Sequence, residues 1–440
     1  MKSKDINMLD IHYIINNKEE VQTNLTNRKV KLSLDDFLIV HQERVELLKK
    51  TESLRQLINQ LSSKIKSRNE VDKSSIVESS KLAKIQLKDR ETELGIIQQK
   101  FSEMLKKIPN KTHPESPIGK DDNENLEIFR YKQPTSFTFK PKDHVQLGKE
   151  LDLIDFENAT KISGAKFYFL KNEAVQLELG LMNFAVDTLL KEGFTLISTP
   201  DLAKLEILEG TGFNPRGEET QVYSVENTDL CLIGTSEITL GGMLSNTTLN
   251  ESDLPIKLLG ISHCFRTEAG AYGKTSKGLY RVHQFTKIEM FIFTTPELSD
   301  STHEYLLDLE KSLFRALDIP FRVVDICTGD LGGPAYRKYD LEAWMPGRPN
   351  EDDSITGNWG EVTSTSNCTD YQSRRLGIKY KNKDGKINFV HMLNGTAFAI
   401  PRVILSIIEN NQQEDGSVVI PKVLEKYIGK SMIQRKKVKI

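Results

Sequence analysis

Glycine and proline are almost absent from the first quarter of the chain. Residues 1–108 contain a single glycine, Gly95, and no proline, whereas both residue types become frequent from Pro109 onward. Because glycine and proline are the two residues that most disfavour a helix interior, such a stretch favours long helices. The chain therefore predicts a helical N-terminal module joined to a globular body of the α/β or α+β class.

The apolar residues of this module recur every three or four positions. They form two series, one of Leu54, Ile58, Leu61 and Ile65, the other of Leu94, Ile97, Phe101, Met104 and Ile108. Both series have the a/d spacing of a coiled coil, and the polar stretch 67–80 between them predicts the turn. We therefore expect an antiparallel helical hairpin over about 34–108, within an N-terminal arm of residues 1–110.

The rest of the chain divides by composition. Residues 111–156 hold several prolines and charges and few periodic positions, which predicts a linker. From 157 to 440, short β-prone runs alternate with helical ones, which predicts a globular domain. The basic stretch 434–440 is interpreted as a frayed, solvated end.

Bulk charge and cysteine content exclude several classes of protein. Sixty Lys and Arg nearly balance sixty-two Asp and Glu, so a nucleic-acid ligand would need a local basic surface. The four cysteines are far apart and form no C-x-x-C pair, which excludes a disulfide framework and favours a reducing compartment. No apolar run approaches the ~18 residues of a membrane span, so we expect a soluble protein without a membrane partner.

The stretch 264–291 carries the strongest chemical signal. Two β-prone ends flank a loop rich in Gly, Ser and Lys, which predicts a hairpin with a long tip. Alternate residues of a strand share a face, and here that face would carry Arg281, His283, Phe285, Lys287 and Glu289. A structural face would be apolar, so this one predicts a site; the alternative is a solvated hairpin with a charged outer face.

Three further clusters contain residues suited to a charged ligand. The run 235–237 ends a β-prone stretch and suits an ammonium group, although Thr-Ser-Glu is also an ordinary helix N-cap. Glu361 and Ser364 offer hard oxygen atoms for Mg²⁺. Arg402, just inside an apolar helix, lies near a positive helix terminus and is a candidate phosphate ligand.

The sequence has no P-loop and no G-x-G-x-x-G after a strand, so an ATP site would be of another kind.

These segments resemble a known family. The stretches 265–268 and 281–285 are similar to motif 2 of class II aminoacyl-tRNA synthetases, 193–200 resembles motif 1, and 394–402 resembles motif 3. The residues at 235–237, 283–289, 366–375 and 393–396 resemble those of seryl-tRNA synthetases, and the likeness extends over about 8–427 of this chain. The runs 339–348 and 396–402 look most like fungal mitochondrial members.

The resemblance implies a fold and an activity. The fold would be α+β, with an N-terminal antiparallel coiled-coil hairpin followed by a class II antiparallel β-sheet domain flanked by helices. Motif 1 would span about 175–200, motif 2 about 260–291 and motif 3 about 391–410. The activity would be that of a serine–tRNA ligase, which activates L-serine with ATP and transfers the seryl group to tRNA(Ser).

The resemblance also assigns roles to individual residues. Arg266 would hold the α-phosphate, Phe285 would stack on adenine, and Arg402 would grip the γ-phosphate; Arg266, Arg402 and Glu361 would carry catalysis. ATP would contact Arg266, Thr267, Glu268, Phe285, Glu361, Val362, Thr363, Ser364 and Arg402, with Mg²⁺ on Glu361 and Ser364. Thr235 and Glu237 would contact the amino group of serine, and Glu289 and Thr396 would contact its hydroxyl. Ser236 would complete the set of serine-binding residues.

The implied partners are tRNA(Ser) and a second copy of the chain. The hairpin carries many cations, including Lys49, Lys50, Arg55, Lys64, Lys66, Arg68, Lys84, Lys88 and Arg90, although a solvated coiled coil would also be charged. The mitochondrial matrix is the expected compartment from the resemblance. The acidic residues among the first thirty favour the cytoplasm as the alternative. Other classes left open are a non-catalytic paralogue, a carrier-protein ligase and a synthetase of different specificity.

Overall fold

The computed structural model describes residues 9–67, 73–213, 221–268, 278–349 and 356–435. The chain divides into two compact units, Met1–Pro109 and Asn110–Ile440. Each unit has a core of its own and is described separately.

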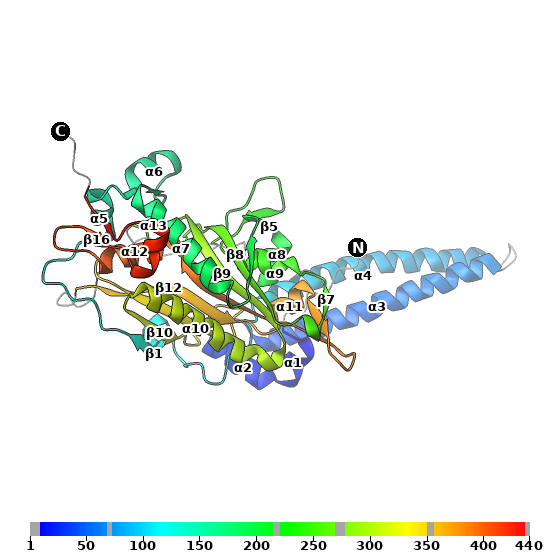
Figure 1. Ribbon diagram of the computed structural model, residues 1–440. Helices are drawn as coiled ribbons and strands as arrows, with labels where there is room; N and C mark the ends of the chain where they lie inside the picture. The colour runs from blue at the N-terminus through cyan, green and yellow to red at the C-terminus, as the bar shows by residue number, and fades with distance from the viewer. Residues whose placement is uncertain (1–8, 68–72, 214–220, 269–277, 350–355, 436–440) are drawn as a thin grey trace. The chain divides into compact units, whose positions relative to one another are not determined.

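The first unit is a long helical hairpin preceded by two short helices (Figure 1). The helices are α1 (Ile11–Asn16), α2 (Lys18–Asn27), α3 (Leu34–Ser67) and α4 (Lys73–Lys106). Phe37 of α3 stacks on Phe101 of α4 with ring centroids 5.3 Å apart, and Arg55 forms a 2.8 Å ion pair with Glu91. The predicted antiparallel hairpin is confirmed.

The turn of the hairpin is shorter than predicted. The polar stretch 67–80 was expected to form it, yet α4 already begins at Lys73. Ser80 is a buried residue of α4, so the polar residues after Lys73 continue the helix. Residues 68–72 lie outside the described part of the chain.

The second unit is built on an eight-stranded sheet (Figure 1). In spatial order its strands are β1 (Leu126–Tyr131), β10 (Phe321–Asp325), β11 (Arg337–Met345), β12 (Asn358–Asn367), β15 (His391–Ala399), β9 (Gln284–Thr294), β8 (Ile256–Phe265) and β4 (Thr195–Ser198). All neighbours are antiparallel except β4 and β8, which are parallel. The predicted α+β class with an antiparallel sheet is confirmed.

Helices and small strands complete this unit. The helices are α5 (His144–Glu150), α6 (Phe156–Ser163), α7 (Glu173–Leu189), α8 (Leu205–Thr211), α9 (Glu237–Met243), α10 (Ser299–Leu317), α11 (Tyr371–Leu376), α12 (Ile400–Asn410) and α13 (Glu425–Ile428). The small strands are β2 (Ile154–Asp155), β3 (Phe169–Leu170), β5 (Leu202–Lys204), β6 (Leu230–Leu232), β7 (Thr248–Asn250), β13 (Lys379–Lys381), β14 (Ile387–Phe389), β16 (Val418–Val419) and β17 (Met432–Ile433). No helix within the described ranges combines the length and apolarity that crossing a membrane requires.

The main core lies on one face of the sheet, under α7, α10 and α12. On β9 the even-numbered residues Ile288, Met290 and Ile292 point into this core, whereas Lys287 and Glu289 point to the opposite face. This is the alternation that a strand imposes. These helices therefore cover the sheet from one side. On the other face a second apolar cluster with α9 and α11 covers Phe291 and Phe293 of β9, and Lys287 and Glu289 lie beside it.

The segment 111–156 is more ordered than a linker. Its strand β1 pairs with β10 at the edge of the sheet, and the rings of Phe129 and Tyr131 lie 6.0 and 5.3 Å from that of Phe321. The run Leu126–Tyr131 alternates polar and aromatic residues only weakly, so the strand depends on a partner far away in sequence.

Candidate active site

A cavity of about 440 Å³ lies on the face of the sheet away from the main core. It is lined by residues of β9, β12 and β15, by the start of α9 and α12, and by the segments 266–268, after β8, and 279–282, before β9. Of the predicted site residues it contains Thr235, Glu237, Arg266, Glu268, Phe285, Glu289, Glu361, Val362, Thr363, Ser364, Thr396 and Arg402. Ser236 and Thr267 do not line it: Ser236 is fully buried, and Thr267 donates its backbone N–H to the Gln221 carbonyl.

A buried triad of polar side chains occupies the centre of the sheet. Glu289 on β9 and Thr396 on β15 are paired in register, and the Thr396 hydroxyl donates to Glu289 Oε2 over 3.1 Å. Lys287 Nζ lies 2.6 Å from the same oxygen. All three residues are buried, so the ammonium compensates a carboxylate that water does not reach. Sequence reasoning placed Lys287 on this face without giving it a role.

Glu237 is a second buried carboxylate in the same cavity, at the first turn of α9. Gln372 Nε2 donates to Glu237 Oε1 over 2.7 Å and to the Thr211 carbonyl over 2.9 Å. Burial, with a smaller contribution from the Glu289 charge, raises the pKa of Glu237 to about 7. Thr235 Oγ1 accepts the Glu237 backbone N–H over 3.2 Å, so the run both starts a helix and lines the cavity. Gln372 lies in the family-like run 366–375, but that run indicates no role for the amide because its partner Glu237 is 135 residues away.

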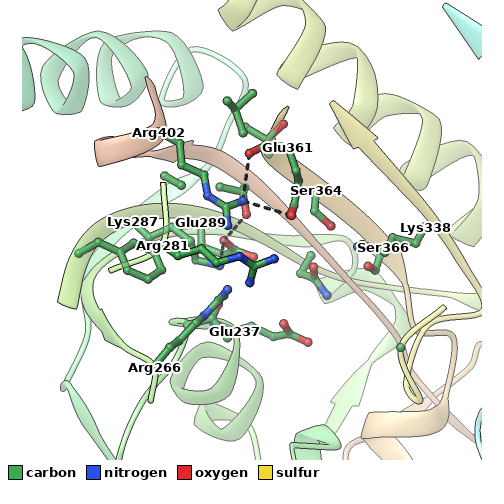
Figure 2. Close-up of a pocket in the computed structure, with 18 of the residues that line it drawn as sticks. Glu237, Arg266, Arg281, Lys287, Glu289, Lys338, Glu361, Ser364, Ser366 and Arg402 are labelled. Carbon is green, nitrogen blue, oxygen red and sulfur yellow. Dashed lines mark hydrogen bonds and ion pairs between the residues drawn. The ribbon is translucent and has the colours of Figure 1, made fainter. Parts of the chain in front are cut away.

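Arg402 and Glu361 form an ion pair at the other end of the cavity (Figure 2). Arg402 Nη1 lies 3.1 Å from Glu361 Oε2 and donates to the Glu361 carbonyl over 3.0 Å, while its Nε donates to the Tyr280 carbonyl over 3.1 Å. Burial alone would raise the pKa of Glu361, but the charges of Arg402 and Lys338 outweigh it and lower the pKa to about 2. Arg402 lies in the first turn of α12 as predicted, and the anion beside it in this structure is the Glu361 carboxylate.

A β-bulge in β12 decides which side chains face the cavity. Residues 361 and 364 are three apart and would lie on opposite faces of a regular strand. In the structure Leu341 pairs with Thr363 and Glu342 with Glu361, so Val362 is the extra residue. Val362 packs into the core and the Thr363 hydroxyl donates to Glu310 of α10 over 2.9 Å. Glu361 and Ser364 consequently share the cavity face (Figure 2).

The oxygen atoms of Glu361 and Ser364 fit a magnesium ion that takes further ligands from a triphosphate. Mg²⁺ in such sites is held by one or two carboxylates together with phosphate oxygens and water. Among the described residues no group of three or more His, Cys, Asp and Glu side chains is placed to hold a metal, so the protein alone does not form a closed cage. The donor set is therefore suited to a metal that arrives with its nucleotide.

The segments that follow β8 and precede β9 supply the remaining charges. Arg266 places its guanidinium 5.4 Å from the Phe285 ring centroid and donates from Nε to the Gly234 carbonyl over 3.3 Å. Arg281 lies 3.2 Å from Glu268. The prediction that His283 lies on the cavity face is wrong, because β9 begins only at Gln284 and the alternation of the strand does not reach His283. His283 Nδ1 instead donates to the Arg266 carbonyl over 2.9 Å. The predicted hairpin tip at 269–277 lies outside the described residues.

The sheet and the paired carboxylate and guanidinium groups on its open face define a class II aminoacyl-tRNA synthetase. Residues 221–411 match the family model described as tRNA synthetase class II core domain (G, H, P, S and T). Residues 8–112 match the seryl-tRNA synthetase N-terminal domain.

Full-length comparisons narrow the class to one family. The chain is 52% identical to a serine–tRNA ligase of Rubrobacter xylanophilus, over 97% of this chain and 99% of that protein. It is 52% identical to a serine–tRNA ligase of Treponema denticola, over 96% and 99%. A crystal structure of seryl-tRNA synthetase from Pyrococcus horikoshii complexed with ATP superposes with a TM-score of 0.84 at 39% identity, covering 98% of this chain and 100% of that one. The chain belongs to the seryl-tRNA synthetase family.

Proposed function

We propose that this chain is a serine–tRNA ligase that converts L-serine and ATP to seryl-adenylate and diphosphate, then transfers the seryl group to the 3′ end of tRNA(Ser). The observation that carries the proposal is a single cavity with two buried carboxylates at one end and the Arg402–Glu361 pair at the other. The first end suits an amino acid with an ammonium and a hydroxyl, and the second suits a polyphosphate.

The serine end recognises the substrate by charge and by hydrogen bonds. Glu237 receives the ammonium group, beside the Thr235 hydroxyl. Both donors to Glu289, from Thr396 and Lys287, reach Oε2, which leaves Oε1 to accept the substrate hydroxyl. Alanine would leave this buried acceptor unpaired, and sites of this kind discriminate by about 10⁴ or more.

The phosphate end explains why Arg402 and Glu361 are paired with each other. In the complex that we propose, the γ-phosphate replaces the Glu361 carboxylate as the anion beside Arg402. Glu361 then becomes available, with Ser364, to hold Mg²⁺, which when bound neutralises phosphate charge. Arg266 also lines the cavity, and its charge acts on both Glu237 and Glu361. It would hold the α-phosphate, with Phe285 beneath the adenine.

Adenylate formation needs alignment and charge neutralisation more than proton transfer. The serine carboxylate is already a nucleophile; its oxygen bonds to the α-phosphorus while the bond from that phosphorus to the diphosphate oxygen breaks. No protein base is required, and Arg266 and Arg402 stabilise the charge that moves onto the leaving diphosphate. In the second step the terminal ribose hydroxyl of the tRNA attacks the seryl carbonyl and AMP leaves.

The helical hairpin is the proposed site for tRNA(Ser). Lys49, Lys50, Lys84 and Lys88 are exposed on α3 and α4, where they can contact phosphates. Contacts of this kind bind an RNA backbone without reading bases and weaken with salt.

A homodimer is the proposed assembly. The edge strand β4, the preceding helix α7 and the residue that ends this helix expose several large apolar side chains, with Leu179 54% exposed. They are Val175, Leu179, Leu190 and Leu196. An unpaired sheet edge beside an apolar surface is the kind of element that a second copy covers.

The compartment stays a prediction. The resemblance of 339–348 to fungal mitochondrial members favours the mitochondrial matrix, whereas the bacterial relatives compared above favour the cytoplasmic alternative. Imaging of a full-chain fluorescent fusion in the source cell separates the two compartments.

An ATP–diphosphate exchange assay across the twenty amino acids tests the function. We expect exchange with serine alone, and charging of tRNA(Ser) in the companion assay. Exchange with another amino acid would indicate a synthetase of different specificity, and no exchange at all would indicate a non-catalytic paralogue.

A further inference from the structure

A buried, hydrogen-bonded histidine–carboxylate pair outside the predicted site lies behind its phosphate end. His144 of α5 is 7% exposed and Glu409 of α12 is 1% exposed. Glu409 Oε1 accepts the His144 backbone N–H over 2.9 Å and lies 2.7 Å from His144 Nδ1. A carboxylate and a histidine are costly to bury, so a pair that the chemistry does not use calls for another role.

The second nitrogen of His144 contacts the turn that precedes β9 and lines the cavity. His144 Nε2 accepts the backbone N–H of Leu279 over 3.0 Å, which requires Nδ1 to carry the ring proton and to donate it to Glu409. The next residue, Tyr280, accepts Arg402 Nε at its carbonyl over 3.1 Å. Its ring centroid also lies 4.6 Å from the Arg402 guanidinium carbon.

Two glycines allow backbone to approach the pair closely. Gly278 has a φ of +68°, and a Cβ there would lie 2.0 Å from His144 Nε2. Gly347 donates its N–H to Glu409 Oε2 over 2.8 Å, and a Cβ there would lie 2.8 Å from Glu409 Oε1. Only glycine fits both approaches, so the backbone on two sides is held by one hydrogen-bonded pair.

We infer that His144 and Glu409 are positioning residues for the ATP subsite. Glu409 and Arg402 lie at opposite ends of α12, and both hold the segment Leu279–Tyr280. Glu409 acts through His144, which accepts the Leu279 N–H, whereas Arg402 donates directly to the Tyr280 carbonyl. The pair thereby fixes the Tyr280 carbonyl and ring against which Arg402 is oriented. This inference rests on the proposed ATP-dependent activation of serine and concerns the alignment of its phosphate end.

Two substitutions of similar size separate positioning from stability. In His144→Gln the side-chain oxygen reaches the place of Nε2 and can still accept the Leu279 N–H. In His144→Asn the shorter amide reaches only the place of Nδ1 and can still donate to Glu409. We expect KM for ATP to stay within about threefold in the first variant and to rise about tenfold in the second, since one lost hydrogen bond is worth about that factor. KM for serine should be unchanged in both, and their melting temperatures should fall alike.

A matched control is available in His303, another buried histidine, whose Nε2 donates to the Thr365 carbonyl over 3.1 Å. His303→Gln should lower the melting temperature without raising KM for ATP. Equal KM values for ATP in His144→Gln and His144→Asn, or a rise in KM for ATP in the control, would overturn the inference. Absence of serine-dependent exchange in the unmodified enzyme would instead overturn the proposed function, so the two failures are distinguishable.

Discussion

Thr396 stands directly opposite Glu289 across the β15–β9 pairing and donates its hydroxyl hydrogen to Glu289 Oε2 over 3.1 Å. Because the Thr396 hydroxyl hydrogen is already donated to Glu289, the Thr396 oxygen can only accept a hydrogen bond from a ligand. The same bond holds one oxygen of the Glu289 carboxylate in place, so that the other oxygen can face the cavity. The pair that we propose to recognise the serine hydroxyl is therefore preorganised by strand register before any substrate arrives.

Thr396→Val should reduce discrimination between serine and alanine. The substitution preserves shape but removes the donor that orients Glu289, and we expect the ratio of kcat/KM values for the two amino acids to fall about tenfold to a hundredfold. Amino-acid-dependent exchange measures both values. Thr294→Val is the matched control, because Thr294 is buried on β9 and its hydroxyl has no hydrogen-bond partner among the described residues. An unchanged ratio in the Thr396 variant would show that Glu289 is oriented without it.

Arg402→Ala and Glu361→Ala should each abolish adenylate formation. Each change also removes the counter-charge of its partner, and because Glu361 is 39% exposed we expect a moderate loss of stability, about 1–3 kcal/mol. The double variant should regain part of the stability but none of the exchange activity. Thermal melting and exchange measured together check this. Near-normal exchange in either single variant would remove these residues from the ATP site.

Serine binding should release protons at about pH 6.5, where the Glu237 carboxyl is still largely protonated. The pKa of Glu237 is about 7 in the folded protein, against an ordinary value of 4.5, so the folded state holds the extra proton between these pH values. This contribution to stability is present at low pH and is lost as pH rises through about 7. The serine ammonium favours the ionised carboxylate, so KM for serine should fall as pH rises from about 6 to 8. Calorimetry in buffers of different ionisation enthalpy measures the number of protons released when serine binds, and the Glu237→Gln variant should release none.

Deleting residues 49–98 should separate tRNA charging from serine activation. The deletion removes most of the hairpin but keeps the Phe37–Phe101 stack at its base, and it removes no residue that lines the cavity. For the deletion variant we expect serine-dependent exchange within about twofold of normal and aminoacylation lower by orders of magnitude. The affinity of the full chain for tRNA should fall steeply as the salt concentration rises. Near-normal charging by the shortened enzyme would assign tRNA recognition to the second unit.

Leu179→Glu should favour monomers if α7 and β4 form the dimer interface. A charge placed among exposed apolar side chains opposes their burial against a second copy. Sedimentation at micromolar concentration should show a dimer for the unmodified chain and a smaller species for the variant. Met243→Glu, at another exposed apolar position, should remain dimeric. A monomer in the unmodified chain contradicts the proposed assembly.

Predictions that depend on local periodicity agree with the structure. The three- and four-residue spacing gave the helices of the hairpin, because helix formation is local, and strand alternation placed Phe285, Lys287 and Glu289 on the cavity face. The same rule failed at His283, one residue before β9 begins, and it gave no sign of the strand β1 within 111–156.

The sequence by itself determined the helical arm, the α+β body and the chemical identity of the groups at the site, since these follow from residue type and short-range spacing. Tertiary structure alone decided that Glu361 and Ser364 share a face, because the bulge at Val362 arises from the pairing of β11 with β12. It also decided that His144 meets Glu409, 265 residues away, and through Leu279 reaches the turn beside Arg402. Such contacts depend on how distant elements pack, and no local pattern of residues encodes them.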